Sequence, residues 1–392
     1  MHLPVYMDHH STTPVDSRVL DAMLPYFTEE FGNASSRTHP YGWRAAEAVE
    51  LARGQVAALI GAEPKEIIFT SGATESINTA LIGLARHFRE KKNHLITCVA
   101  EHSATLDTCK SLEAEGVCVT YVSVIADGTI DLTALESALT DDTFLISIMH
   151  ANNEVGTIHP IEAIGALAAR RSVLFHVDAA QTCGRIPIDI RTQNVDLLSL
   201  SAHKLYGPKG VGALAITRRS PRTRIAPLLH GGGHERGIRP GTLNVPGIVG
   251  LGAACEILRH EMSSESARLT ALRNHLLDQL QSRLNGLHVN GTMESRLPNN
   301  LNVSFAGVEG ESLIVSLRNI VAVSSGSACT SARVEPSHVL AAMGVSKDLI
   351  HSSIRFGLGR STTPEEVDFV ADAVADSVKR LRALGFADSQ IS

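Results

Sequence analysis

The chain has 392 residues, of which 44% are apolar and 19% charged, and its formal net charge is -6 at pH 7. This length exceeds the size at which one hydrophobic core usually stops growing, so it predicts two domains or a large domain with a smaller one. Lysine and arginine are scattered rather than gathered in a basic stripe, which argues against a nucleic-acid-binding protein. The sequence has neither a targeting signal at its start nor an apolar run of transmembrane length, so we expect a cytoplasmic protein without membrane contact.

Short apolar runs alternate with segments of helical periodicity from Ile67 to about Val211. The runs are EIIF, LITCVA, VCVTYVSV, FLISIMH, VLFHVDA and VDLLSLS. The segments between them predict helices that start near Thr74, Ser103, Leu132 and Ile161. Such runs are typical of parallel strands that are buried on both faces. The pattern predicts an α/β fold with a mostly parallel sheet covered by helices.

The C-terminal part predicts a smaller α+β domain. The loop HGGGHERGIRPGT leads into a long helical stretch from about Val245 to Leu284, and the strand-like runs NLNVSFA and SIRFGLG follow. A last helix is expected from Pro364 to Leu384, because proline suits a first turn and Gly385 can end the helix. We assign the large domain to residues 15–258, and the small domain to residues 1–14 and 259–392.

Polar residues follow several of the predicted strands. Ligands of open α/β sheets bind at the carboxyl ends of the strands, so these residues are site candidates. The segment TSGATES after EIIF predicts a glycine turn and a helix start, whose free N–H groups and dipole can bind a phosphate. An ordinary capped turn is the alternative. His102 follows LITCVA, and a hydrogen-bonded histidine without catalytic role is its alternative.

Asp178 and Lys204 follow two further strands, in HVDAAQT and SAHKLYGPKG. A carboxylate at the end of an apolar run needs a cation or strong donors, and a salt-bridged or capping aspartate is the alternative reading. Desolvation at a sheet edge disfavours the ammonium form of a lysine, which favours an amine nucleophile; the alternative is a surface lysine. A phosphate site, a carboxylate and such a lysine are together what pyridoxal phosphate requires.

Eight segments resemble the cysteine desulfurases of iron-sulfur cluster assembly, which are pyridoxal-phosphate enzymes of fold type I. They occur in the same order, and the resemblance runs from about Tyr6 to Arg382. The segments are TSGATES, EH, NNEVG, HVDAAQ, SAHKLYGPKG, GGGHERGIRPGT, SSGSACTS and SSIRFGLGR. The resemblance implies a homodimer that acts on L-cysteine and hands sulfur to an iron-sulfur scaffold or another acceptor protein.

The resemblance also implies roles for individual residues. Lys204 would hold the cofactor as a Schiff base, Asp178 would face its pyridine nitrogen, and His102 would stack on its ring. Gln181 would reach the ring hydroxyl, and Asn153 would contact both the cofactor and the substrate carboxylate, which Arg355 would bind as well. The phosphate would be bound by Ala73, Thr74, Ser201 and His203, together with Thr242 of the partner subunit.

The six cysteines include no CxxC pair, which fits neither a disulfide framework nor a zinc site. Cys98, Cys118 and Cys255 lie in apolar or helical segments and predict buried, inert thiols. Cys329 lies in the small, polar segment SSGSACTS, which predicts an exposed, mobile loop. The resemblance implies that Cys329 takes up the substrate sulfur as a persulfide, with protons moved by Lys204 and His102. It implies no metal in the resting enzyme, with contact to a cluster only through that persulfide.

Two features depart from the family pattern. Ser11 stands where relatives usually have alanine, near the expected substrate entrance, and the chain ends eight residues after Leu384, which leaves scaffold docking by a C-terminal tail open. One alternative function is a selenocysteine lyase or a small-substrate aminotransferase on the same fold. The other is a non-enzymatic metal or cluster carrier that uses histidines such as His9, His10, His230 and His234, although HH and HER are typical of solvated loops.

Overall fold

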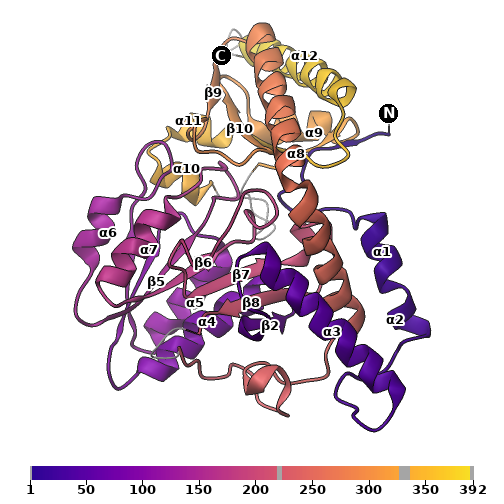
Figure 1. The fold of residues 1–392 in the computed structure, drawn as a ribbon. Helices are drawn as coiled ribbons and strands as arrows, with labels where there is room; N and C mark the ends of the chain where they lie inside the picture. Colours follow the sequence, from indigo (N-terminus) through magenta and orange to yellow (C-terminus); the bar gives the residue numbers. More distant parts are fainter. Residues whose placement is uncertain (1, 219–222, 326–335, 389–392) are drawn as a thin grey trace.

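The computed structural model describes residues 2–218, 223–325 and 336–388. The strands lie in three sheets (Figure 1). They are β1 (Val5–Tyr6), β2 (Ile67–Thr70), β3 (His94–Cys98), β4 (Cys118–Val122), β5 (Thr143–Met149), β6 (Leu174–Asp178), β7 (Leu197–Ser201), β8 (Gly212–Ile216), β9 (Leu287–Val289), β10 (Asn300–Phe305), β11 (Val321–Ala322) and β12 (Ser353–Gly357).

Helices cover the sheets and connect them. The α-helices are α1 (Ser17–Met23), α2 (Pro25–Thr28), α3 (Pro40–Leu59), α4 (Ala73–Phe88), α5 (Ser103–Ala114), α6 (Leu132–Ala138), α7 (Ile161–Arg170), α8 (Val245–Arg283), α9 (Gly310–Leu317), α10 (His338–Ala342), α11 (Lys347–His351) and α12 (Pro364–Asp388). Short 3₁₀ helices are η1 (Pro64–Glu66), η2 (Ala202–Lys204) and η3 (His234–Gly237).

The main sheet has seven strands in the order β2-β8-β7-β6-β5-β3-β4. The strands from β7 to β4 run parallel, while β8 pairs antiparallel with both β7 and β2. All residues of β2, β3, β5, β7 and β8 are buried, as expected for strands between two helical layers. The prediction of a mostly parallel α/β sheet is therefore confirmed.

Side chains of the main sheet alternate between two hydrophobic layers. Ile68, Leu95 and Leu145 belong to the layer formed with α4 and α5. The residues that follow them, Phe69, Ile96 and Ile146, belong to the opposite face, where α3, α6, α7 and the first half of α8 complete the larger cluster. Because parallel strands end at the same edge of the sheet, the residues after β3, β5, β6 and β7 gather there.

A second, smaller sheet has the order β12-β10-β9 and is antiparallel. It packs with the second half of α8, with α9 and with α12 around a separate hydrophobic cluster, in which Val5 and Met7 from the start of the chain take part. Figure 1 shows α8 running from the main sheet into this second unit. The N-terminal strand β1 joins the same unit by pairing in parallel with β11.

The two main clusters divide within α8, between Leu258 and Leu269. This division agrees with a boundary near residue 258, and the domain limits stay a proposal. Residues of α10, however, pack in the larger cluster although they lie between elements of the second unit in the sequence.

Three predictions about local structure are wrong. Cys118 is exposed, because β4 is the edge strand of the main sheet, whereas Cys98 and Cys255 are buried. The last helix continues through Gly385 to Asp388, so that glycine does not end it. The pair HH is not a solvated loop, since His9 is 2% and His10 1% exposed.

Candidate active site

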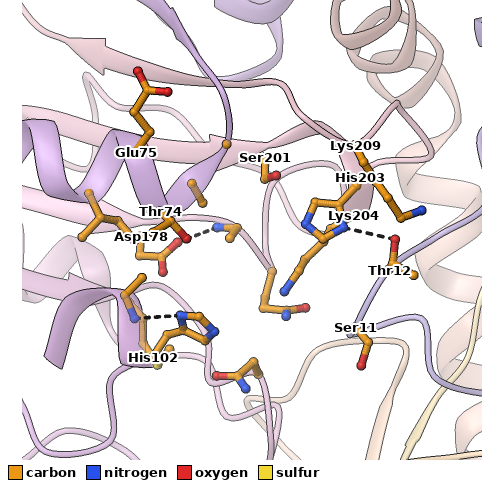
Figure 2. A pocket seen from close by; sticks show the side chains of 18 of the residues that line it. Ser11, Thr12, Thr74, Glu75, His102, Asp178, Ser201, His203, Lys204 and Lys209 are labelled. Carbon is orange, nitrogen blue, oxygen red and sulfur yellow. Dashed lines mark hydrogen bonds between the residues drawn. The ribbon is translucent and has the colours of Figure 1, made fainter. Parts of the chain in front are cut away.

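A cavity of about 530 Å³ opens at the carboxyl edge of the main sheet. This volume is within the range of ordinary small-molecule sites. Figure 2 shows Asp178 and His102 on one side of the cavity and Lys204, His203 and Thr12 on the other. Nine of the residues predicted for the site line it, namely Ala73, Thr74, His102, Asn153, Asp178, Gln181, Ser201, His203 and Lys204.

The start of α4 forms one wall of the cavity. Its N-cap is Gly72, which offers no side-chain cap to the first turn, so backbone N–H groups at Ala73 and Thr74 stand at the positive end of the helix. The preceding turn is tied to the helix by the buried pair Thr70 Oγ1 and Ser76 Oγ, 2.8 Å apart. Such a helix start binds anions, phosphate groups among them.

Asp178 is the last residue of β6, and its carboxylate is buried. The Ala180 N–H donates to its Oδ1 at 2.9 Å. Burial raises the pKa of this carboxyl, whereas that hydrogen bond and the charges of His102 and Lys204 lower it. A carboxylate under these opposing effects is best stabilised by a cationic donor in the cavity, such as a protonated ring nitrogen.

His102 is the N-cap of α5. Its Nδ1 accepts a hydrogen bond of 3.1 Å from the Ala104 N–H, so the neutral ring carries its proton on Nε2. Burial lowers the pKa of His102, the carboxylate of Asp178 raises it, and Lys204 and His338 lower it further. The side chain is therefore a flat, neutral ring at the edge of the cavity, with one N–H donor.

Lys204 ends η2, directly after β7. Its carbonyl oxygen accepts a hydrogen bond of 3.4 Å from Arg185 Nη2, and its side chain lines the cavity. The neighbouring His203 ring has Nδ1 3.1 Å from Thr12 Oγ1. Burial, together with the positive charges of Lys204 and Lys209, lowers the pKa of His203 to about 4. Lys204 and Lys209 thus place two positive charges in a lining that also contains the carboxylates of Glu75 and Asp178.

Arg355, predicted to bind the substrate carboxylate, lies in β12 beside the cavity rather than in its lining. It is 2% exposed. Nη2 donates to Asp8 Oδ1 at 2.9 Å and to Ser11 Oγ at 3.0 Å, and Nη1 donates to the Asn153 carbonyl at 2.8 Å. Ser11 and Asn153 line the cavity, so the guanidinium is one hydrogen bond away from its lining.

Thr242 and Cys329 are the two remaining residues predicted for the site. Thr242 is exposed in the loop before α8. Its assignment to the site of a partner subunit stays a proposal. Cys329 lies outside the described residues.

The prediction missed several lining residues, the polar Thr12 and the charged Lys209 among them. Both belong to motifs visible in the sequence, DHHSTTP and SAHKLYGPKG, but neither stands directly after a predicted strand. The rule that site residues follow strand ends therefore did not select them.

Among residues 2–218, 223–325 and 336–388, no group of three histidine, cysteine or acidic side chains is arranged to hold a metal ion. The histidines named for a metal carrier are dispersed in the fold: His9 and His10 are buried near Gly357, whereas His230 is exposed. Within the same ranges, no helix is both long and apolar enough to span a membrane.

Comparison with known proteins gives consistent matches along the chain. The family model of class-V aminotransferases matches residues 5–370. Cysteine desulfurase IscS of Anaeromyxobacter sp. (strain Fw109-5) is 58% identical over 384 residues, which cover 98% of this chain and 95% of that protein.

Two solved structures are also similar. A NifS-like protein superposes with a TM-score of 0.90 at 42% identity, covering 96% of this chain and 100% of that one. SspA, solved in complex with cysteine, superposes with a TM-score of 0.81 at 40% identity, covering 90% and 98%. The chain therefore belongs to the class-V aminotransferase family, and within it to the pyridoxal-phosphate-dependent cysteine desulfurases.

Proposed function

We propose that the cavity binds pyridoxal 5'-phosphate and L-cysteine, and that the chain converts L-cysteine to L-alanine while Cys329 receives the sulfur. One observation carries this proposal: Lys204, Asp178 and the uncapped start of α4 all line a single cavity. An amine, a buried carboxylate and an anion site at one place match the three recognition needs of the cofactor.

The residues present fit the cofactor. Ala73, Thr74, Ser201 and His203 would hold its phosphate, with Thr242 of the partner subunit. The pKa of His203, lowered to about 4 chiefly by burial, keeps its ring neutral. Asp178 would pair with the ring nitrogen, Lys204 would hold the aldehyde carbon, and Gln181 would contact the ring hydroxyl. When bound, pyridoxal phosphate supplies an electron sink for the bonds broken at the substrate carbon atoms.

The chain's own groups would position the substrate and move protons. Asn153 lines the cavity, and its carbonyl holds the guanidinium of Arg355, so the two residues form one unit for the substrate carboxylate. The Lys204 amine can accept the proton of the substrate Cα and return it. His102 can donate its Nε2 proton, because Nδ1 is occupied by the Ala104 N–H.

Sulfur transfer needs a nucleophile that can leave the cavity with its product. A thiolate at Cys329 would attack the sulfur of L-cysteine; the substrate C–S bond breaks, a new S–S bond forms, and the carbon left behind takes a proton to give alanine. The products are one persulfide and one alanine, so no external oxidant is needed. The resting enzyme needs no metal, and Cys329 would meet a cluster only through its persulfide.

The proposed setting is a homodimer in the cytoplasm. Thr242 of one subunit would complete the phosphate site of the other. The persulfide would pass to an iron-sulfur scaffold or to another sulfur-acceptor protein, as the name of the relative in Anaeromyxobacter suggests. The cysteines described by the structure, Cys98, Cys109, Cys118, Cys183 and Cys255, are all free thiols, which fits a reducing compartment.

Mass spectrometry after incubation with L-cysteine tests the proposal. We expect an added sulfur atom on the Cys329 peptide and an equal amount of alanine. The Lys204→Ala variant should lose the yellow colour and both products. The Cys329→Ala variant should keep the colour but form no persulfide.

Other outcomes identify the alternatives. A Cys329→Ala variant that releases alanine at the unaltered rate would favour a selenocysteine lyase or an aminotransferase. A colourless protein that ignores added pyridoxal phosphate but retains metal would favour a carrier.

A further inference from the structure

His10 is a buried residue next to the cavity that the proposed chemistry does not use. It lies between β1 and α1 and is only 1% exposed. Its ring does not line the cavity, but its hydrogen-bond partner Gln181 does. Whatever His10 contributes to the site must therefore pass through Gln181.

Two hydrogen bonds join these residues, and both involve the Gln181 amide. Gln181 Nε2 donates to the His10 main-chain carbonyl oxygen at 3.1 Å. Gln181 Oε1 lies 3.0 Å from His10 Nδ1. A single residue thus contacts both ends of the amide group.

The main-chain carbonyl of His10 determines both the orientation of the Gln181 amide and the position of the proton on the His10 ring. A carbonyl oxygen only accepts, so the amide must turn its NH₂ group toward it. The amide oxygen then faces His10 Nδ1, which must carry the proton. A flipped amide would bring two oxygens together at the carbonyl and two N–H donors together at the ring.

The other atoms around His10 agree with a neutral ring. Burial lowers its pKa well below the ordinary histidine value, and the charges of Arg355, Lys204 and Arg185 lower it too, against the Gln181 hydrogen bond, which raises it. Within the described part of the chain, His10 Nε2 has no hydrogen-bond partner, as expected for a bare lone pair in a buried position.

The Gln181 amide therefore has one N–H group left that can bind a ligand. Its oxygen accepts from His10 Nδ1, and one of its two N–H bonds goes to the His10 carbonyl. The second N–H remains, on a side chain that lines the cavity. A donor at this point suits an anionic oxygen on the ligand, whereas the flipped amide would present its oxygen and repel that group.

We propose that His10 is a positioning residue that locks the Gln181 amide with an N–H toward the cavity, where it donates to the phenolate oxygen of pyridoxal phosphate. The inference rests on the proposed cofactor binding. With the cofactor held through Lys204, its phenolate oxygen would stabilise the protonated form of the Lys204 nitrogen. A donor that draws charge from this oxygen lowers the pH at which that proton leaves.

A pH titration of the visible absorption band tests this without turnover. In the cofactor-loaded protein without substrate, His10→Leu should raise the titration midpoint by about 0.5 to 1 pH unit. A shift of this size corresponds to the free energy of one hydrogen bond. Gln181→Leu should raise it by the same amount. The double variant should give no further rise, because both changes remove a single interaction.

Two further variants separate orientation from packing. His10→Asn places an amide N–H close to the position of Nδ1 and should restore the original midpoint. His9→Asn alters the adjacent buried histidine, whose Nδ1 lies 2.9 Å from the Gly357 carbonyl and not near Gln181, and should leave the midpoint unchanged.

The inference is overturned if His10→Leu keeps the original midpoint while Gln181→Leu moves it, if the two shifts add in the double variant, or if His10→Asn shifts as much as His10→Leu. None of these three outcomes contradicts the proposed function. Absence of the visible band from the unaltered protein would instead overturn both.

Discussion

At the scale of single residues, the site depends on a carboxylate that must be charged although burial disfavours its charged form. Asp178 has to be negative to pair with a protonated ring nitrogen, although burial raises the pKa of its carboxyl. The Ala180 N–H at 2.9 Å and the charges of Lys204 and His102 act against that effect. A bound cation would also lower the pKa of Asp178. The negative charge of this residue and the binding of the cofactor therefore favour each other.

Asp178→Asn removes this charge with little change of shape. We expect alanine formation from L-cysteine to fall by about 100-fold or more, because a neutral amide does not hold the proton on the ring nitrogen. The visible band should persist, since Lys204 is intact. Asp141→Asn, at an exposed position, serves as the control and should keep full activity. Activity of Asp178→Asn within two-fold of the unaltered protein would contradict the role assigned to the carboxylate.

At the scale of elements, the anion site depends on how closely β8 approaches the turn before α4. A Cβ atom at Gly212 would lie 2.6 Å from the Gly72 Cα and 2.5 Å from the Leu200 carbonyl oxygen. Both contacts are to backbone, which cannot move as a flexible side chain would. Gly212 therefore allows the helix start to lie against the end of β7, where Ser201 ends the strand and Lys204 follows.

Gly212→Ala should push this turn outward. We expect the free energy of unfolding to fall by about 1 to 3 kcal/mol, the ordinary cost of overpacking. Fluorescence titration of the cofactor-free protein should show affinity for pyridoxal phosphate weakened by about ten-fold, equivalent to about 1.4 kcal/mol.

Gly54→Ala is the matched control for this change. Nothing lies within 4 Å of a Cβ built there, in the middle of α3. Alanine should stabilise that helix by up to about 1 kcal/mol and leave cofactor affinity unchanged. Equal cofactor affinity in both variants would show that the close approach does not shape the anion site.

At the scale of the whole molecule, a buried ion network connects the two hydrophobic units through α8. Glu265 in this helix is 8% exposed and pairs with Arg185 at 2.6 Å and with Arg360 at 2.7 Å. Both guanidinium groups also lie over the ring of Tyr206, at 4.8 and 4.3 Å from its centroid. The network therefore joins α8 to the segment that directly follows Lys204.

Glu265→Ala should leave the buried Arg185 guanidinium without its carboxylate, whereas Arg360 keeps its pair with Asp16 at 2.5 Å. The expected loss in the free energy of unfolding is about 3 kcal/mol, measured by urea denaturation, because an uncompensated buried charge is costly. Glu256→Ala is a control on the same helix; its pair with Arg259 is exposed and should contribute less than about 1 kcal/mol. Similar losses for the two variants would argue that the network adds nothing beyond a surface pair.

Buried neutral histidines make the stability of the whole molecule depend on pH. Burial lowers the pKa of His150 and His159 to about 4 and that of His176 to about 3. The unfolded chain binds protons at these residues near pH 6.5, where the folded chain does not. Their contribution to stability is thus present above pH 6.5 and is lost as the pH falls toward 4. Glu101 and Asp178, whose pKa values burial raises, act in the opposite direction, but they are two groups against three histidines.

We expect the cofactor-free protein to be at least about 2 kcal/mol less stable at pH 5 than at pH 7, since each such histidine contributes up to about 1.4 kcal/mol per pH unit. Urea denaturation at both pH values measures the difference. His176→Gln should make the difference smaller, because its ring, 2.8 Å from Ser147 Oγ and 2.9 Å from Ser199 Oγ, is replaced by a group that does not titrate.

His288→Gln, at an exposed position, should leave the pH difference unchanged. Stability that is equal at pH 5 and pH 7 in the unaltered protein would refute the assignment of these rings as neutral.

Elements with a strong local signal could be predicted from the sequence. The helices expected near Thr74, Ser103, Leu132 and Ile161 begin at or within one residue of those positions, since apolar periodicity and caps are local properties. Cys118 shows the limit of such reasoning: its apolar surroundings predict burial, but only strand order reveals that β4 is an edge. Likewise, glycine is typical of a helix end, but α12 continues through Gly385 to Asp388.

The sequence by itself determined the class of fold, the family and which strand ends carry polar groups, because these follow from short-range patterns and long motifs. Only the tertiary structure decided which of these groups meet. Arg355 pairs with Asp8 and Ser11, and Gln181 pairs with His10, across separations of more than a hundred residues. Hydrogen bonds depend on distance and direction between atoms in space, and sequence order does not contain that information until the chain is folded.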